Sequence, residues 1–200
     1  MMSGILTKTY DAPSIDRSEI LRYAGIRGRE EEMEHLLDEC LDKVLERLTY
    51  RVCFGEFLVT FHKKSVDLSA FRTESESLIA HLSGCGRAIL FGATVGVELD
   101  RLIARYSAIS PTRALLLQAI GTERIEALCD TFEADLRADL QKTGQHLGKR
   151  FSPGYGDLSI EVQREIFLTL GLPKRIGLTL NDSLLMSPTK SVTAILGIAD

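Results

Sequence analysis

Residues 150–157 have the sequence Arg150-Phe-Ser-Pro-Gly-Tyr-Gly-Asp157, which combines a guanidinium, a proline, two glycines and an aromatic ring. An arginine offers a planar fork of donors that matches a carboxylate, and a proline presets the backbone angle of a turn. Glycines let the backbone approach a ligand closely, and a tyrosine presents a ring with a polar tip. The stretch therefore indicates either a ligand-binding loop or a turn in which the arginine pairs with a nearby acid.

A second unusual segment covers residues 176–198, with the sequence IGLTLNDSLLMSPTKSVTAILGI. Two apolar stretches flank the polar turn Ser187-Pro-Thr-Lys-Ser191. Apolar and β-branched residues on either side of such a turn are typical of a hairpin. We therefore expect two short strands that pair with each other across this turn.

The loop at 150–157 and the proline-centred hairpin that leads into Ser191-Val-Thr together resemble the activation domain of cobalamin-dependent methionine synthase. The resemblance is closest from Ile125 to Ile198, and the order of the earlier elements is similar to the small stand-alone versions of this domain. In that family, the domain binds S-adenosylmethionine and presents it to an inactive cob(II)alamin. Methyl transfer, with an electron from a reductase, then restores methylcobalamin.

The resemblance implies a cofactor-binding site. Arg150 would anchor the carboxylate of S-adenosylmethionine, Tyr155 would contact the ring or the sulfonium, and the following backbone would lie along the adenine or ribose. Asp130 falls on the position of an acid that faces the ammonium, and Glu126, one helical turn earlier, is its substitute. The alternative is that Tyr155 packs in the core. The expected cofactor-binding residues are Glu126, Asp130, Arg150, Pro153, Gly154, Tyr155, Gly156, Asp157 and Ser191.

Two departures from the family pattern leave a second function open. The full-length enzymes carry an acid shortly before the arginine, where this chain has Thr143-Gly-Gln-His-Leu-Gly-Lys149, and aromatic residues where it has Ala194-Ile-Leu196. A non-catalytic interaction subunit of a corrinoid methyltransferase that has lost cofactor binding is therefore the alternative. The sequence shows no nucleophile–base pair, so we expect no catalytic residue and no turnover by the protein alone.

The resemblance also implies partners. These are a cobalamin-binding methionine synthase or other corrinoid protein and an electron donor such as a flavodoxin. A third class, an ordinary S-adenosylmethionine methyltransferase, would need a glycine-rich turn after a strand of a parallel sheet. The candidate at Gly92–Gly96 lacks the three-glycine spacing.

Composition narrows the remaining classes. The net charge of −4 argues against a nucleic-acid binder, and no apolar run approaches a membrane span. The start of the chain lacks the pattern of a secretory leader, so the cytoplasm is expected. The four cysteines contain no Cys-x-x-Cys pair, which predicts buried free thiols and no metal site.

The chain organisation predicts one compact α+β unit, with a bent, mainly antiparallel sheet flanked by helices. We expect an N-terminal arm at residues 1–15 and a single unit at 16–200. Helical periodicity and capping residues predict the helices, and β-branched and aromatic runs predict the strands. The expected helices cover 16–25, 29–50 with Glu30 in the first turn, 69–82, 97–106, 110–121, a second helix from Thr122 to about Leu140, and 159–170; the expected strands cover 51–62 and 88–96.

Overall fold

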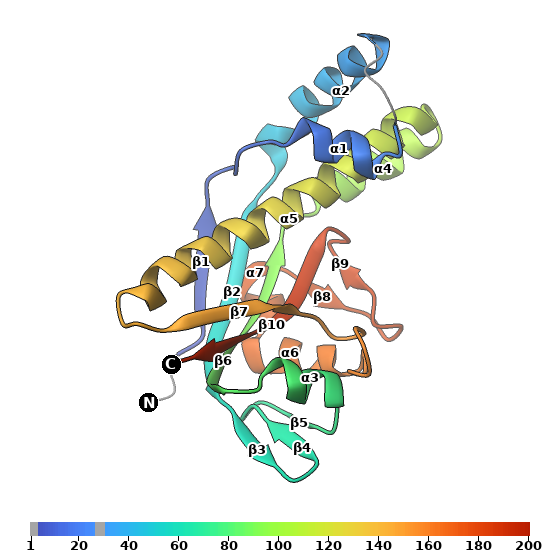
Figure 1. The fold of residues 1–200 in the computed structure, drawn as a ribbon. Helices are drawn as coiled ribbons and strands as arrows, with labels where there is room; N and C mark the ends of the chain where they lie inside the picture. Colours follow the sequence, from blue (N-terminus) through green and yellow to red (C-terminus); the bar gives the residue numbers. More distant parts are fainter. Residues whose placement is uncertain (1–3, 27–30) are drawn as a thin grey trace.

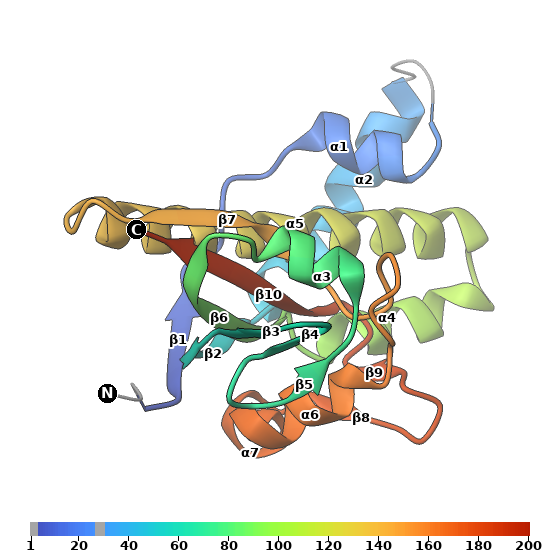
Figure 2. The same cartoon turned by 60° about the horizontal axis from the view of Figure 1, so that its bottom comes forward.

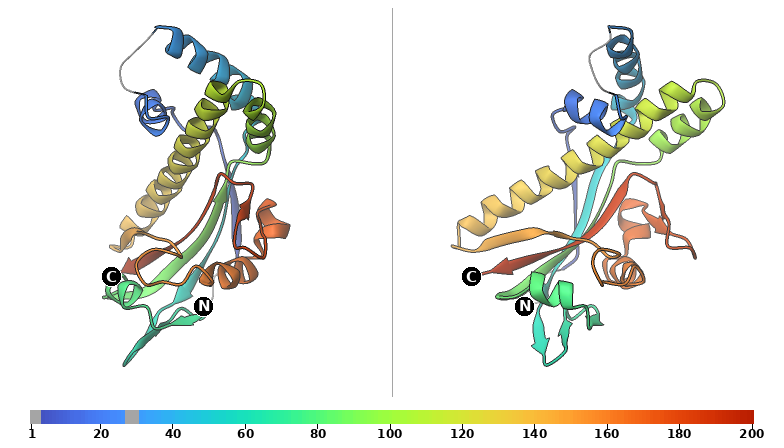
Figure 3. Two further views of the ribbon diagram at one scale, coloured as in Figure 1. Left: turned by 90° about the vertical axis from the view of Figure 1, so that its right-hand side faces the viewer. Right: turned by 45° about the vertical axis from the view of Figure 1, so that its right-hand side comes forward.

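The protein folds around one five-stranded sheet with the strand order β1-β2-β6-β10-β7 (Figure 1). The structure is a computed structural model that describes residues 4–26 and 31–200. Every neighbouring pair in the sheet is antiparallel, and the sheet bends strongly along its strands (Figure 3). The expected α+β class and the bent antiparallel sheet are therefore confirmed. The strands are β1 Leu6–Tyr10, β2 Tyr50–Leu58, β6 Cys85–Thr94, β7 His146–Phe151 and β10 Ser191–Ala199.

Helices cover both faces of the sheet, and the side chains of the central strands alternate between two cores. In β6, Phe91 belongs to the first core and Leu90 to the second. The first core lies under α1 Arg17–Tyr23, α2 Glu31–Val44, α4 Glu98–Ser107 and α5 Pro111–Gln141. The second lies under α3 Glu76–His81, α6 Val162–Leu170 and α7 Leu172–Ile176, on the other side of the sheet from α5 (Figure 2).

Short elements complete the fold. Strands β3 Thr60–His62, β4 Ser65–Asp67 and β5 Arg72–Thr73 form a small three-stranded sheet, and a 3₁₀ turn, η1 Leu45–Arg47, follows α2. The expected helix at 69–82 is confined to α3, because β5 takes its first part. The expected helix start at 29–30 lies outside the described residues. Within the described ranges, no helix is long and apolar enough to cross a membrane.

Two local capping signals in the sequence, at the start of α1 and at the end of α6, agree with the structure. Asp16 Oδ1 accepts a hydrogen bond from Glu19 N at 3.1 Å and begins α1. Gly171 has a φ of +62° and ends α6, as expected of a C-terminal glycine. Residues 6–10 of the expected arm form strand β1, which pairs with β2 at the edge of the sheet. The division into an arm and a unit at 16–200 stays a prediction.

The prediction that Gly121 separates two helices was wrong, because α5 is continuous over 31 residues. Gly121 lies inside α5 where the helix approaches the start of β10 and helix α4. A Cβ at this position would lie 2.2 Å from Leu99 Cδ2 and 2.8 Å from Lys190 Cγ. The glycine therefore permits close packing of the helix and does not end it.

The predicted hairpin at 176–198 was also wrong in its pairing. The first stretch folds on itself, because β8 Thr179–Leu180 pairs with β9 Met186–Ser187. The second stretch becomes β10, which lies between β6 and β7 in the main sheet. Residues 194–198 of β10 are buried on both faces, so this apolar run is stabilised by two packed layers and by two neighbouring strands.

The close approach at Gly121 predicts a reversal of the usual glycine-to-alanine effect. An alanine inside a solvent-exposed helix normally stabilises it by about 1 kcal/mol relative to glycine. Gly121→Ala would instead force its Cβ into the buried side chain of Leu99, and we expect a net loss of about 1 kcal/mol or more in the free energy of unfolding. Urea denaturation measures it. Gly86→Ala, which has open space around the added Cβ, is the control.

Candidate functional site

Three acids form a stripe along one face of α5 and meet Arg150 at the end of β7. Glu126, Asp130 and Glu133 are spaced by four and three residues, which places them on the same side of a helix. Arg150 Nη1 donates to Glu126 Oε2 at 3.0 Å, and Nη2 donates to Asp130 Oδ1 at 2.7 Å. Arg150 Nε lies 2.6 Å from Glu133 Oε1, as an ion pair without the direction of a hydrogen bond. The structure therefore brings together three of the predicted site residues and adds Glu133.

The charges in this cluster are exposed to different degrees. The exposed fraction is 24% for the Arg150 side chain, 41% for Glu126, 70% for Asp130 and 7% for Glu133. Burial disfavours the charge on Arg150, but nearby Cys129 and the acids favour it and hold its pKa above the ordinary value. An arginine has five N–H donors, and within the described residues two of those on Arg150 make hydrogen bonds. A partly exposed guanidinium with unused N–H donors can still donate hydrogen bonds to the carboxylate of a ligand.

Cys129 lies beside this cluster but does not supply a nucleophile. Its side chain is fully buried in α5. Burial raises the pKa of its thiol to about 12, although the Arg150 charge acts in the opposite direction. A thiol with this pKa stays protonated at neutral pH and packs as a small apolar group.

Strand β7 ends beside the Arg150 cluster and is shorter than its neighbour β10. Strand β7 pairs with β10 up to Phe151, which is opposite Ile195. The chain then leaves the sheet through the 152–157 loop, so residues 191–194 of β10 lie beyond the end of β7. Arg150 is thus the penultimate residue of an edge strand, next to the stretch of β10 that β7 does not pair. Strand β7 itself runs below α5 in Figure 1.

The 152–157 loop has the backbone that its glycines predict. Gly154 and Gly156 have φ values of +87° and +59°, and a Cβ on Gly156 would lie 2.7 Å from Ser77 Oγ. Pro153 is buried beneath the loop, whereas Tyr155 is exposed. The ring centroids of Tyr155 and Phe151 lie 5.5 Å apart in an edge-on contact. Because the Tyr155 side chain is exposed, the alternative of a core tyrosine is not observed.

Asp157 holds the loop against α3. Its carboxylate accepts hydrogen bonds from Glu76 N at 2.7 Å, from Ser77 N at 3.1 Å and from the Ser75 hydroxyl. The Ser75 hydroxyl, followed by these backbone N–H groups, lowers the pKa of Asp157 to about 2. The side chain is therefore engaged within the protein and fixes where the loop lies.

Ser191 begins β10 and is buried. Its hydroxyl donates to the Pro188 carbonyl at 2.8 Å and shares a second hydrogen bond with Thr94 Oγ1 at 2.9 Å. The neighbouring Lys190 Nζ donates to Thr122 Oγ1 at 3.0 Å. Because Thr122 lies one helical turn before Glu126, this contact connects the start of β10 to the acid stripe.

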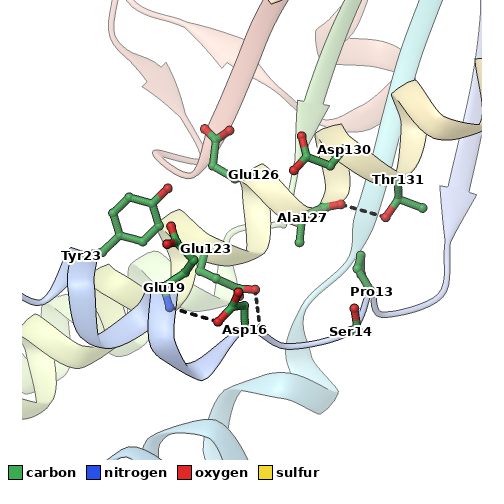
Figure 4. A pocket seen from close by; sticks show the side chains of 10 residues that line it. All are labelled: Pro13, Ser14, Asp16, Glu19, Tyr23, Glu123, Glu126, Ala127, Asp130 and Thr131. Carbon is green, nitrogen blue, oxygen red and sulfur yellow. Dashed lines mark hydrogen bonds between the residues drawn. The ribbon is translucent and has the colours of Figure 1, made fainter. Parts of the chain in front are cut away.

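An acid-lined hollow of about 440 Å³ lies between α5 and residues 13–23, and Glu126 and Asp130 form part of its lining (Figure 4). This volume is within the range of small-molecule sites. Five carboxylates line the hollow: Asp16, Glu19, Glu123, Glu126 and Asp130. Four of them are paired with arginines, because Arg22 pairs with Glu19, Arg124 with Glu123, and Arg150 with Glu126 and Asp130.

A buried ion pair fixes the wall of the hollow. Arg124 is fully buried and pairs with Glu123. Its guanidinium also donates to the backbone carbonyls of Pro13 and Ser14, at 2.6 and 2.7 Å, and Glu123 Oε1 accepts from Asp16 N at 3.0 Å. Two charged side chains of α5 thus hold residues 13–16 of the N-terminal segment against the helix.

Sequence reasoning missed Glu133 and three acids of the hollow, Asp16, Glu19 and Glu123. Glu133 had a detectable signal, since it continues the spacing of Glu126 and Asp130 by three residues. Asp16 and Glu19 had none, because more than a hundred residues separate them from Glu126. Among the residues that the structure describes, no group of three or more His, Cys, Asp or Glu side chains is placed to hold a metal ion.

The architecture has a counterpart among solved structures. A crystal structure of the MetH reactivation domain bound to AdoHcy matches 97% of this chain and 78% of its own, with a TM-score of 0.72 and 18% sequence identity. The chain therefore has the fold of the MetH reactivation domain, as the sequence resemblance predicted. No protein family and no curated protein matches the sequence itself.

The fold does not agree with an ordinary doubly wound methyltransferase. Strand β6, which contains Gly92, pairs antiparallel with both of its neighbours. A Cβ on Gly92 would lie 2.7 Å from Leu172 Cδ1, so this glycine allows α7 to pack on the sheet.

The buried pair predicts a large cost for removing one charge. Arg124→Met would leave Glu123 buried without its partner, and we expect a loss of about 3–5 kcal/mol in the free energy of unfolding. The double variant Glu123→Gln with Arg124→Met should recover part of this loss. Chemical denaturation of both variants measures it, and a double variant less stable than Arg124→Met would contradict the pairing.

The lowered pKa of Asp157 predicts that this side chain makes a pH-dependent contribution to the stability of the fold. The folded pKa of about 2 lies below the unfolded value of about 3.9, so ionised Asp157 stabilises the fold above pH 4. This contribution is lost as the pH falls towards 2. Asp157→Asn should lower the midpoint of urea unfolding at pH 7, with a smaller difference from wild type at about pH 3. A difference that is constant over this range would contradict the assignment.

Proposed function

We propose that the protein binds S-adenosylmethionine beside the Arg150 cluster and supports the reductive methylation of cob(II)alamin. The partner would be a cobalamin-dependent methionine synthase or a related corrinoid methyltransferase. The observation that carries the proposal is the meeting of Arg150 with Glu126 and Asp130, in a fold shared with a MetH domain that was crystallised with AdoHcy.

The charges of the cluster match the amino-acid end of this ligand. Arg150 has N–H donors available for a carboxylate, as a bidentate contact. Asp130 is the most exposed acid and Glu126 is half-exposed, so either carboxylate can receive an ammonium group. The hollow adds the carboxylate of Asp16 nearby, whereas its other acids, Glu19 and Glu123, are paired with arginines.

The loop and the open edge of β10 would hold the rest of the ligand. Tyr155 presents an exposed ring on a loop whose position is fixed by Asp157. Gly154 and Gly156 expose backbone beside it, and Pro153 supports the turn from below. Ser191 would act through the backbone at the start of β10, because its hydroxyl is already engaged.

In this role the protein contributes position and electrostatics. S-adenosylmethionine supplies a sulfonium methyl group, and an electron donor such as a flavodoxin supplies the electron that accompanies its transfer to cob(II)alamin. The side chains of the cluster hold the amino-acid end, so that the methyl group faces a docked corrinoid protein. Four buried free cysteines are compatible with the reducing cytoplasm, where we place this reaction.

A second candidate is a non-catalytic subunit that binds the corrinoid protein without a cofactor of its own. It is favoured by the acids that already satisfy part of Arg150, and by the aliphatic Ala194-Ile-Leu196 where the family has aromatic residues. The two candidates differ in whether the isolated protein binds S-adenosylmethionine.

Calorimetric titration of S-adenosylmethionine into the purified protein tests the proposal. We expect micromolar binding by the wild type and at least tenfold weaker binding by Arg150→Ala, because a charge-assisted bond contributes about 1.5–3 kcal/mol. Arg150→Lys keeps the charge but loses the planar fork, so it should bind at an intermediate level. Thermal unfolding confirms that the variants are folded.

Arg164→Ala is the matched control, since Arg164 lies on α6 across the sheet and pairs with Glu161. It should bind like the wild type. Absence of heat from folded wild-type protein would favour the second candidate. Co-elution with a cobalamin-loaded methionine synthase would then test for the interaction subunit.

A further inference from the structure

Glu133 is the one acid of the Arg150 cluster that is almost completely buried. Its two oxygens face two arginines: Oε1 lies 2.6 Å from Arg150 Nε, and Oε2 accepts from Arg137 Nη2 at 2.7 Å. Glu133 is carried by a helix, and Arg137 holds it from one turn further along α5. Arg137 therefore holds the carboxylate by a hydrogen bond at Oε2, whereas Oε1 faces Arg150 as an ion pair. Unlike Glu133, Glu126 is half-exposed and Asp130 is exposed.

The three acids hold different parts of the guanidinium. Glu126 and Asp130 contact the terminal nitrogens, which are also the atoms that form a fork for a carboxylate. Glu133 contacts Nε, at the inner end of the group. When a ligand competes for the terminal nitrogens, Glu133 is the charged contact that remains at the inner end of the guanidinium.

We propose that Glu133 is a positioning residue, which aims the donors of Arg150 so that the site selects ligands with an α-carboxylate. The inference rests on the proposed function and deepens it. Glu133 is too deeply buried to touch the ligand itself, so it acts through Arg150. Ordering a long side chain when a ligand binds costs conformational entropy. This cost is smaller when the orientation of the guanidinium is already fixed in the free protein.

Simple electrostatics makes the opposite prediction, which allows a sharp test. Removing the charge of Glu133 would make the surroundings of Arg150 more positive. That change alone would favour a ligand with a carboxylate and disfavour a ligand that is only cationic. If Glu133 orients Arg150, its removal should instead weaken the binding of the ligand that has the carboxylate.

The experiment compares two probes by calorimetric titration: S-adenosylmethionine and its decarboxylated analogue, in which hydrogen replaces the carboxylate. For Glu133→Gln and Glu133→Asp, we expect the preference for S-adenosylmethionine over the analogue to fall at least about fivefold. Glu133→Asp keeps the charge but withdraws the carboxylate by one methylene group. Asp139→Asn, an exposed change of the same charge on the same helix, should leave the preference unchanged.

A preference that rises in Glu133→Gln, or that stays as in wild type in Glu133→Asp, would overturn the positioning role. Equal weakening of both probes would overturn it as well and assign Glu133 to general stability. If thermal melts show that the Glu133 variants do not fold, Arg137→Gln releases the same carboxylate from its outer side, and the preference must fall there too.

Wild-type protein that binds neither probe would overturn the proposed function together with this inference. Wild-type protein that binds both while the variants keep their preference would overturn the inference alone.

Discussion

Helix α5 lies across one face of the sheet and carries most of the groups on which the candidate site depends (Figure 1). At Gly121 it comes so close to Leu99 of α4 and to Lys190 that a Cβ would lie 2.2 Å from Leu99 Cδ2. Protein interiors are packed too densely for this close approach to vary without cost. Because α5 is continuous, the helix that packs the core also carries the acid stripe that meets Arg150.

Two buried acids of α5 show how charge is kept inside this fold. Glu123 is satisfied by Arg124 and by a backbone N–H of the N-terminal segment, and Glu133 lies between Arg150 and Arg137. A buried charge is costly unless it is paired, so each acid fixes the segment that supplies its partner. One of them secures the wall of the hollow, and the other secures the arginine of the proposed site.

The proposed site therefore combines parts of different rigidity. The buried pairs and the loop anchored by Asp157 are held within the protein, whereas Asp130, Glu126 and Tyr155 remain accessible. This division is what a binding protein needs, because fixed groups reduce the entropy lost on binding and accessible groups meet the ligand. The chemistry would then belong to the methyl donor and to the corrinoid of the partner.

The fold class, the caps of the helices at Asp16 and Gly171, and the turn at residues 152–157 could be predicted from the amino-acid sequence, because they depend on local conformational preferences and on a pair of motifs. The sequence also indicated that Arg150, Asp130 and Glu126 belong together. Three features became visible in the three-dimensional structure alone: Gly121 lies inside a helix, β10 joins the main sheet, and Glu133 faces Arg150 while Asp16 and Glu19 line the hollow. These depend on packing between segments far apart in the chain, and neither helical periodicity nor turn chemistry encodes which distant surfaces will meet.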